Sequence, residues 1–134
     1  MAALDMIEGI GDSYREKLEN AGVNSVETLL ESGAKPAGRK ALAEKTEISP
    51  KLILRWVNHA DLFRIKGIAS QFAELLEASD VDSVLELSHR KPENLHAKLV
   101  EVNTEKKLVR QVPGLSQIEE FVSQAKSLDR AVEH

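Results

Sequence analysis

The apolar residues of this chain recur at helical rather than strand spacing. Tyr14, Leu18 and Ala21 fall at i, i+4 and i+7, and Gly22 follows where helices commonly end on a left-handed residue. No stretch of the sequence alternates apolar and polar residues for long enough to indicate a strand. Leu, Ala, Glu and Lys, which are strong helix formers, dominate the composition. The pattern predicts an all-α protein.

Helix starts and breaks divide the chain further. Asn24 or Ser25 is a typical cap for the helix that follows, and the Ser49-Pro50 pair is a typical cap and first helical residue for a later one. The side chains that this later helix is expected to turn inward are Leu52, Ile53, Trp56, Val57 and Ala60. The strongest breakers, expected between helices, are Gly33 to Gly38, Lys91-Pro92 and Val112-Pro113-Gly114.

One segment of the chain returns 58 residues later. Ile7-Glu8-Gly9-Ile10-Gly11 corresponds to Ile65-Lys66-Gly67-Ile68-Ala69, and the turn and apolar positions that follow correspond as well. The sequence therefore predicts a duplicated scaffold, with a first unit at residues 1–63 and a second at residues 64–134.

The short element Gly9-Ile10-Gly11 is the first that could carry chemistry. Two glycines around one apolar residue make a tight turn and leave backbone N–H groups free at the positive end of the next helix, where a phosphate can bind. The element resembles the helix-hairpin-helix motif, which holds nucleic-acid backbones without reading sequence. If Gly11 takes a positive φ, a β-branched side chain there would strain the backbone. The predicted hairpin-turn residues are Gly9, Ile10, Gly11, Gly67, Ile68 and Gly114.

A second, glycine-poor turn follows in each half. Ile48-Ser49-Pro50 lies in the first half and Pro113-Gly114-Leu115-Ser116 in the second. The helices after these turns are related, because Trp56-Val57 aligns with Phe121-Val122 at an offset of 65. The sequence thus predicts four hairpins in two pairs, that is, two tandem double helix-hairpin-helix units.

Nearly the whole chain resembles a bacterial family of uncharacterised domains built from tandem helix-hairpin-helix units. The residues that carry the resemblance are Ile7-Glu8-Gly9-Ile10-Gly11, the run from Leu54 to Leu62, and the runs from Arg90 to Lys98 and from Val102 to Arg110. The resemblance implies a helical fold, and it implies no particular activity. The doubled hairpins are also more distantly similar to the acidic C-terminal repeats of a bacterial transcription elongation factor, which bind protein as well as nucleic acid.

The hairpins depart from the pattern of DNA-binding hairpins. Asp12 follows Gly11, and Arg15 stands where that pattern has a small residue. In the second copy the second glycine is replaced by Ala69, and residues 70–74 hold no cation. The first hairpin is therefore expected to be a weakened phosphate clamp and the second to be purely structural.

Charge alternates along the chain in step with the repeat. Residues 1–34 hold seven acidic and two basic side chains, and residues 65–88 hold five and one. The segments that follow, at residues 35–51 and 90–110, each carry a net charge of +3. The whole chain has a net charge of −4.

Two functions compete to explain this polarity. A polyanion could lie along the basic segments, with Lys106-Lys107-Arg110 as its strongest contact, although the overall negative charge opposes it. Acidic and basic halves could instead meet between molecules, which favours a protein adaptor. Solvated helix faces with mixed charge are the third interpretation. The candidate polyanion or partner contacts are Lys35, Arg39, Lys40, Arg90, Lys91, Lys98, Lys106, Lys107 and Arg110.

Catalysis finds little support in the sequence. The four histidines show no metal-ligand spacing, and the chain has no cysteine, so we expect no metal site, no cofactor and no disulfide. Asn94 and His96 are candidate polar contacts, because their side chains can bond exposed backbone at a helix start. For His96, a helix cap or a hydrogen bond between the units is preferred over a role as a ligand or as an acid or base.

Further polar residues are interpreted as helix caps. Asn103-Thr104 is expected to start a helix that runs through Val109, and Asp12 or Ser13 is expected to cap the helix that carries Tyr14 in the core.

We therefore expect a non-enzymatic, cytoplasmic binding or adaptor module. Protein interaction or self-association is the first expectation, and weak, sequence-independent nucleic-acid binding is the alternative. Every apolar run is broken by charge well before the roughly 20 residues that a membrane helix needs, so no membrane contact is expected. Nothing in the sequence indicates a small-molecule substrate.

Overall fold

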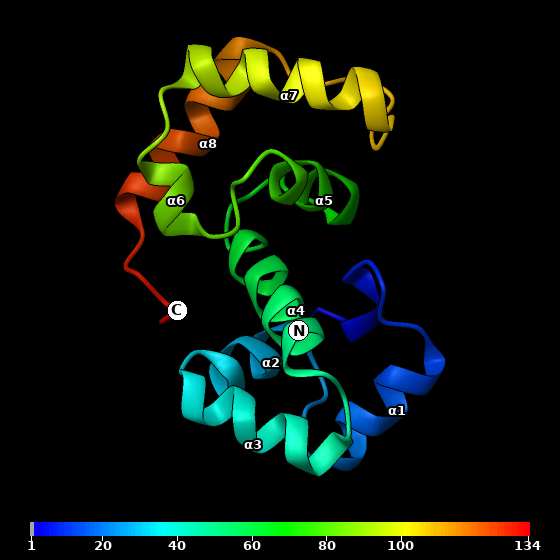
Figure 1. Cartoon of the computed structure of the whole chain (residues 1–134). Helices are drawn as coiled ribbons and strands as arrows, with labels where there is room; N and C mark the ends of the chain where they lie inside the picture. Colours follow the sequence, from blue (N-terminus) through cyan, green and yellow to red (C-terminus); the bar gives the residue numbers. More distant parts are fainter. Residues whose placement is uncertain (1) are drawn as a thin grey trace. The chain divides into compact units, whose positions relative to one another are not determined.

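The computed structural model describes residues 2–134, and all regular secondary structure in that range is helical (Figure 1). No strand occurs between these residues, so the predicted all-α class is confirmed for them. None of the described helices is long and apolar enough to cross a bilayer. The elements in chain order are the 3₁₀ helix η1 (Leu4–Met6) and the α-helices α1 (Asp12–Asn20), α2 (Val26–Gly33), α3 (Pro36–Thr46), α4 (Pro50–Leu62), α5 (Ser70–Ala78), α6 (Val84–Ser88), α7 (Pro92–Lys106) and α8 (Leu115–Ser127).

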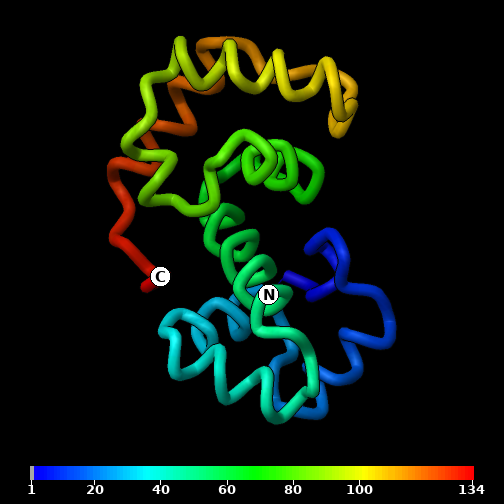
Figure 2. Tube along the Cα trace, in the orientation of Figure 1, coloured from blue at the N-terminus to red at the C-terminus, as the bar shows by residue number. Residues whose placement is uncertain are grey.

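The chain divides into two compact units. Unit 1 contains the residues up to Asp61 together with Ala131–His134, and unit 2 contains Leu62–Arg130. Figure 2 follows the chain through unit 1 (blue to green) and unit 2 (from green through yellow and orange), and then into residues 131–134 at the red end. This division differs from the predicted one at 1–63 and 64–134 in its boundary and in the last four residues.

Unit 1 is organised around Trp56 of α4. Its side chain is fully buried, as the helical spacing predicts, and the half-buried ring of Tyr14 meets it edge-on with 5.0 Å between ring centroids. The other large, fully buried side chains of this unit are Leu4, Ile7, Leu18, Leu29 and Ile53. Helices α1, α2 and α4 and the 3₁₀ turn therefore all contribute to its apolar interior.

Unit 2 has its own apolar core, in which α8 packs on α6 and α7, and α7 packs on α5. The rings of Phe72 on α5 and Phe121 on α8 lie 5.5 Å apart between centroids. Further core residues are Leu75, Leu76, Leu87, Leu95, Leu99 and Val122. Phe121 and Val122, which align with Trp56 and Val57 in the sequence, are both buried.

Helices in both units begin and end with the same kinds of capping residue. Ser25 caps α2 by accepting the amide N–H of Thr28 at 3.1 Å, as predicted, and Ser83 caps α6 by accepting that of Glu86 at 3.1 Å. Helices α3 and α7 both begin with a proline in the first turn. Both also end on a left-handed residue that is not glycine, with φ values of 59° and 52°.

Two predicted caps are wrong. The first helix begins after Gly11, whose extended backbone makes it the N-cap, and Asp12 is its first helical residue. Asn103 lies inside α7 near its C-terminal end, and its side chain bonds the main chain of Val109 beyond that end. An asparagine side chain can bond free main-chain groups at either end of a helix. Its presence in the sequence therefore indicates a helix end but not which of the two ends.

The segment from Gly33 to Gly38 is not the long break that its glycines suggest. Gly33 ends α2 and Gly38 lies in the first turn of α3, so the two helices are joined by only two residues. A Cβ atom at Gly38 would overlap the carbonyl oxygen of Ser32, and one at Gly33 would lie 2.5 Å from Cγ2 of Val57. These glycines are needed because helices approach closely here, and not because the chain turns.

In the first predicted hairpin turn, the residue with a positive φ is Gly9 rather than Gly11. Gly9 has a φ of 96°, whereas Gly11 has a φ of −90° and open space where a Cβ would lie. Gly9→Ala is expected to destabilise the protein by about 1–3 kcal/mol through backbone strain. Gly11→Ala is expected to change stability by less than about 0.5 kcal/mol. Urea unfolding of the two variants checks this, and equal losses would contradict the assigned turn geometry.

Candidate functional site

The first predicted glycine hairpin is followed by Arg15, whose positive charge is already neutralised by carboxylates. Arg15, on the first turn of α1, forms ion pairs with Asp12 at 3.2 Å, Asp5 at 3.5 Å and Glu19 at 3.7 Å. Three carboxylates around one guanidinium leave a negative local field, which repels a phosphate approaching the helix N-terminus.

The turn of the second predicted glycine hairpin is contacted by side chains of α8 in the same unit. Gly67 has a φ of 100°, and a Cβ atom there would lie 3.0 Å from a ring carbon of Phe121. The main chain of the neighbouring Lys66 donates to Oε1 of Gln124 at 2.9 Å and accepts from Nε2 of the same side chain at 3.2 Å. Helix α8 is thus held against this turn. The remaining predicted turn residue, Gly114, is the N-cap of α8 and has a negative φ of −66°.

Two of the predicted basic contacts are structural. Arg39 is buried, and its guanidinium donates to the carbonyl oxygens of Gly33 at 2.8 Å, Ala34 at 3.2 Å and Glu133 at 2.7 Å. Burial lowers the pKa of Arg39 from its ordinary value, and the Glu133 carboxylate opposes this shift. Arg90 pairs with the Glu86 carboxylate at 3.0 Å and donates to the carbonyl of Asp80 at 3.1 Å. Both guanidinium groups are thus engaged by groups of the protein itself.

The other predicted contacts divide between the units. Lys35 and Lys40 are exposed on α3 in unit 1, and Lys91 and Lys98 are placed at the start and middle of α7 in unit 2. The predicted polar pair Asn94 and His96 lies near the first turn of α7, where Asn94 is exposed and His96 is half-buried. These last residues are separate from the cavity described next.

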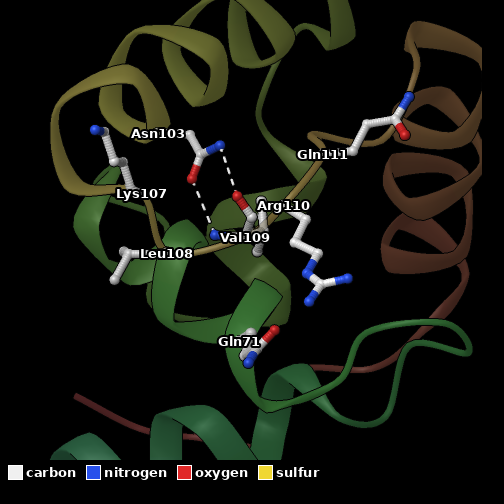
Figure 3. Close-up of a pocket in the computed structure, with 7 residues that line it drawn as sticks. All are labelled: Gln71, Asn103, Lys107, Leu108, Val109, Arg110 and Gln111. Atoms are coloured by element: carbon white, nitrogen blue, oxygen red, sulfur yellow. Dashed lines mark hydrogen bonds between the residues drawn. The ribbon is translucent and has the colours of Figure 1, made fainter.

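A surface cavity of about 840 Å³ opens where α7 ends, and it lies entirely within unit 2. It brings together Lys107 and Arg110, two members of the last predicted basic cluster, with Gln71 at the start of α5 (Figure 3). Figure 3 shows the guanidinium of Arg110 on the same side as the amide of Gln71, while the Lys107 side chain extends away from both. The lining residues are Gln71, Asn103, Lys107, Leu108, Val109, Arg110 and Gln111. We call this cavity the basic pocket.

The wall of the basic pocket is ordered by main-chain bonds. Lys107 is the left-handed C-cap of α7, and its amide N–H donates to the carbonyl of Asn103 at 2.8 Å. The Asn103 side chain then holds Val109 from both sides, accepting its N–H at 3.0 Å and donating to its carbonyl at 3.0 Å. These bonds fix the chain that carries Arg110, as Figure 3 shows. A pocket wall fixed in advance loses less entropy when a ligand binds.

The lining of the basic pocket carries positive charge and no acid. Lys107 and Arg110 are both exposed, and neither forms an ion pair with any of residues 2–134. Gln71 and Gln111 add amide groups that donate or accept hydrogen bonds. No group of three or more potential metal ligands occurs among the described residues. The chemistry of the pocket therefore suits a carboxylate or phosphate, and no nucleophile with an adjacent base lines it.

Sequence reasoning found Lys107 and Arg110 through their charge, but it missed Gln71 and the role of Asn103. Gln71 is distant in the sequence and has no local motif, whereas Asn103 had a signal that was assigned to the wrong helix end. Lys106, the third member of the predicted cluster, is exposed on the last turn of α7 and is not part of the pocket lining.

A family model described as Domain of unknown function (DUF4332) matches residues 8–128. The chain belongs to this family. The DUF4332 match includes Gly9, Gly67 and every residue of the basic pocket. No curated protein and no solved structure gives a significant match to the chain.

Proposed function

We propose that this DUF4332 protein is a non-enzymatic, cytoplasmic binding module that holds an acidic segment of a protein partner in the basic pocket. The observation that carries the proposal is the acid-free lining, in which Lys107 and Arg110 stand on a chain that Asn103 has already ordered. Electrostatic complementarity of this kind steers association and selects partners of opposite charge.

We also infer that the two units are copies of one double helix-hairpin-helix unit. Support comes from the positive φ of both Gly9 and Gly67 and from the serine caps at Ser25 and Ser83. Each pair is separated by the 58-residue period of the sequence. Such a scaffold offers similar surfaces twice, and charge differences between the copies then decide which surface binds.

A protein partner is favoured over nucleic acid by the state of the hairpins. Arg15 is surrounded by carboxylates, and the main chain beside Gly67 is occupied by Gln124. A nucleic-acid backbone would also meet a chain with a net charge of −4, whereas a short acidic peptide contacts only the pocket.

Charge reversal in the basic pocket is expected to weaken acidic-peptide binding about tenfold, which corresponds to about 1.4 kcal/mol. The variant is Lys107→Glu with Arg110→Glu, and the probe is a fluorescein-labelled oligoglutamate peptide followed by anisotropy. The matched control is Lys17→Glu with Lys45→Glu, which changes the net charge equally through exposed side chains of unit 1. The control should retain wild-type affinity.

The same titration with duplex and single-stranded DNA tests the alternative. If DNA binds more tightly than the peptide, with a steep loss of affinity in salt that depends on Lys106 and Lys107, the protein is a nucleic-acid backbone binder. If the pocket variant and the control weaken peptide binding equally, the basic pocket is not the site and the proposal fails.

A further inference from the structure

Residues 131–134 lie on unit 1 in the manner of a bound peptide. Helix α8 ends at Ser127, and the following residues run without helical structure to the end of the described chain. Val132 is buried, with 2% of its surface exposed. The N–H of Glu133 donates to the carbonyl of Ala34 at 2.8 Å, and the carbonyl of Glu133 accepts from Nη2 of Arg39 at 2.7 Å. Nε2 of His134 lies 2.9 Å from Oδ1 of Asn58.

These contacts recognise a main chain more than a particular side chain. Glu133 is held through its N–H and carbonyl, while its side chain is exposed. Only Val132 contributes a buried side chain to this segment. Extended peptides are usually recognised by hydrogen bonds to their main chain together with burial of alternate side chains.

The surface that receives this segment continues beyond it. Arg39 also lines an open cavity of about 280 Å³, which residues 131–134 leave unfilled. The other lining residues combine apolar side chains with two exposed lysines, and they are Pro36, Lys40, Pro50, Lys51 and Leu54. This cavity belongs to unit 1, and its lining carries no acidic residue. An acidic and apolar peptide longer than residues 131–134 would fit it by charge.

We propose that unit 1 carries a peptide-docking groove, formed by the end of α2 with α3 and α4, that binds an extended segment of a partner protein. The segment has a β-branched apolar residue in the position of Val132, followed by a residue held through its main chain and flanked by acidic side chains. The chain's own residues 131–134 fill this groove and compete with the partner. The groove shares no residue with the basic pocket of unit 2, so an experiment can contradict one of the two proposals without contradicting the other.

The test uses the full chain and a fluorescein-labelled peptide with the sequence of residues 128–134. Val132→Asp places a charge in the buried position and should release the chain's own segment. The peptide is expected to bind this variant at least tenfold more tightly than it binds wild type. Glu133→Gln is the matched control and should stay close to wild type, because both hydrogen bonds of Glu133 to the groove come from its main chain and its exposed carboxylate adds only a charge near Arg39. Circular dichroism checks that each variant is folded.

A second variant tests the groove itself. In the Val132→Asp background, Lys40→Glu with Lys51→Glu should weaken binding of a glutamate-extended form of the peptide severalfold, because residues 131–134 alone leave the cavity of these lysines unfilled, whereas Lys17→Glu with Lys45→Glu should leave binding unchanged. On wild-type protein, excess unlabelled peptide should shift the amide NMR signals of residues 131–133 to those of a released segment. This NMR measurement uses the wild-type protein, so it tests the proposed competition even if Val132→Asp does not fold.

Two results would overturn the proposal. The first is equal peptide affinity for wild type and Val132→Asp, together with unchanged amide signals of residues 131–133 under excess peptide. The second is a wild-type dimer in sedimentation that Val132→Asp abolishes, because the occupant would then be the same segment of a second copy.

Discussion

Replacement of Trp56 by alanine is expected to lower the free energy of unfolding of unit 1 by about 3–5 kcal/mol. The indole is fully buried on α4, and the Tyr14 ring packs edge-on against it. Removal of the ring deletes its buried apolar surface and leaves a cavity that the surrounding helices can fill only in part. Urea unfolding followed by far-ultraviolet circular dichroism measures the loss.

Trp56→Phe is the matched control for this prediction. Nε1 of Trp56 is buried and has no hydrogen-bond partner among residues 2–134. A buried N–H left without an acceptor costs about 1–3 kcal/mol, so phenylalanine removes that cost while it retains most of the aromatic contact. We expect Trp56→Phe to lose less than half as much stability as Trp56→Ala. Equal losses would show that the indole is held by a bond through Nε1 rather than by its packing.

The parts of the fold that follow local rules could be predicted from the sequence. The burial of Trp56 and Leu18 follows from helical spacing, and the cap at Ser25 follows from side-chain chemistry that acts over three residues. In each case the deciding interaction involves residues on one helix or its immediate boundary. Such interactions are contained in a short window of sequence.

The errors arose where a residue type serves more than one purpose. The sequence predicts a break from Gly33 to Gly38, because a glycine that ends a helix and a glycine that admits a neighbouring helix look alike in the sequence. The sequence predicts Arg39 to be a surface cation, whereas its partners include a carbonyl 94 residues away. No local pattern records a contact of that range.

The candidate sites were predictable to different degrees. Charge alone pointed to Lys107 and Arg110, which line the basic pocket. Gln71 joins them only because α5 and α7 pack together in unit 2. The docking groove of unit 1 left no signal in the sequence, since its main interactions are to main-chain atoms at Ala34 and Glu133. Binding surfaces built from backbone groups are therefore found only once the fold is known.

Because α2 and α3 approach closely, we expect a substitution at Gly38 to change stability in the direction opposite to the one that helix propensity gives. Gly38 lies inside a helix, where alanine is ordinarily favoured over glycine by about 1 kcal/mol. A Cβ atom there would overlap the carbonyl oxygen of Ser32, which is part of the main chain and cannot move without the helix. We expect Gly38→Ala to destabilise unit 1 by about 1–3 kcal/mol. Thermal or urea unfolding gives the sign directly.

Lys40→Ala is the control on the same helix. Lys40 is exposed two residues further along α3, and its truncation should change stability by less than about 0.5 kcal/mol. If Gly38→Ala stabilises the protein, α2 and α3 are farther apart than described. Since Arg39 follows Gly38 and bonds both Gly33 and Glu133, a displaced α3 would also weaken the docking groove. Gly38→Ala should therefore release residues 131–134 in the same NMR experiment that detects the partner peptide.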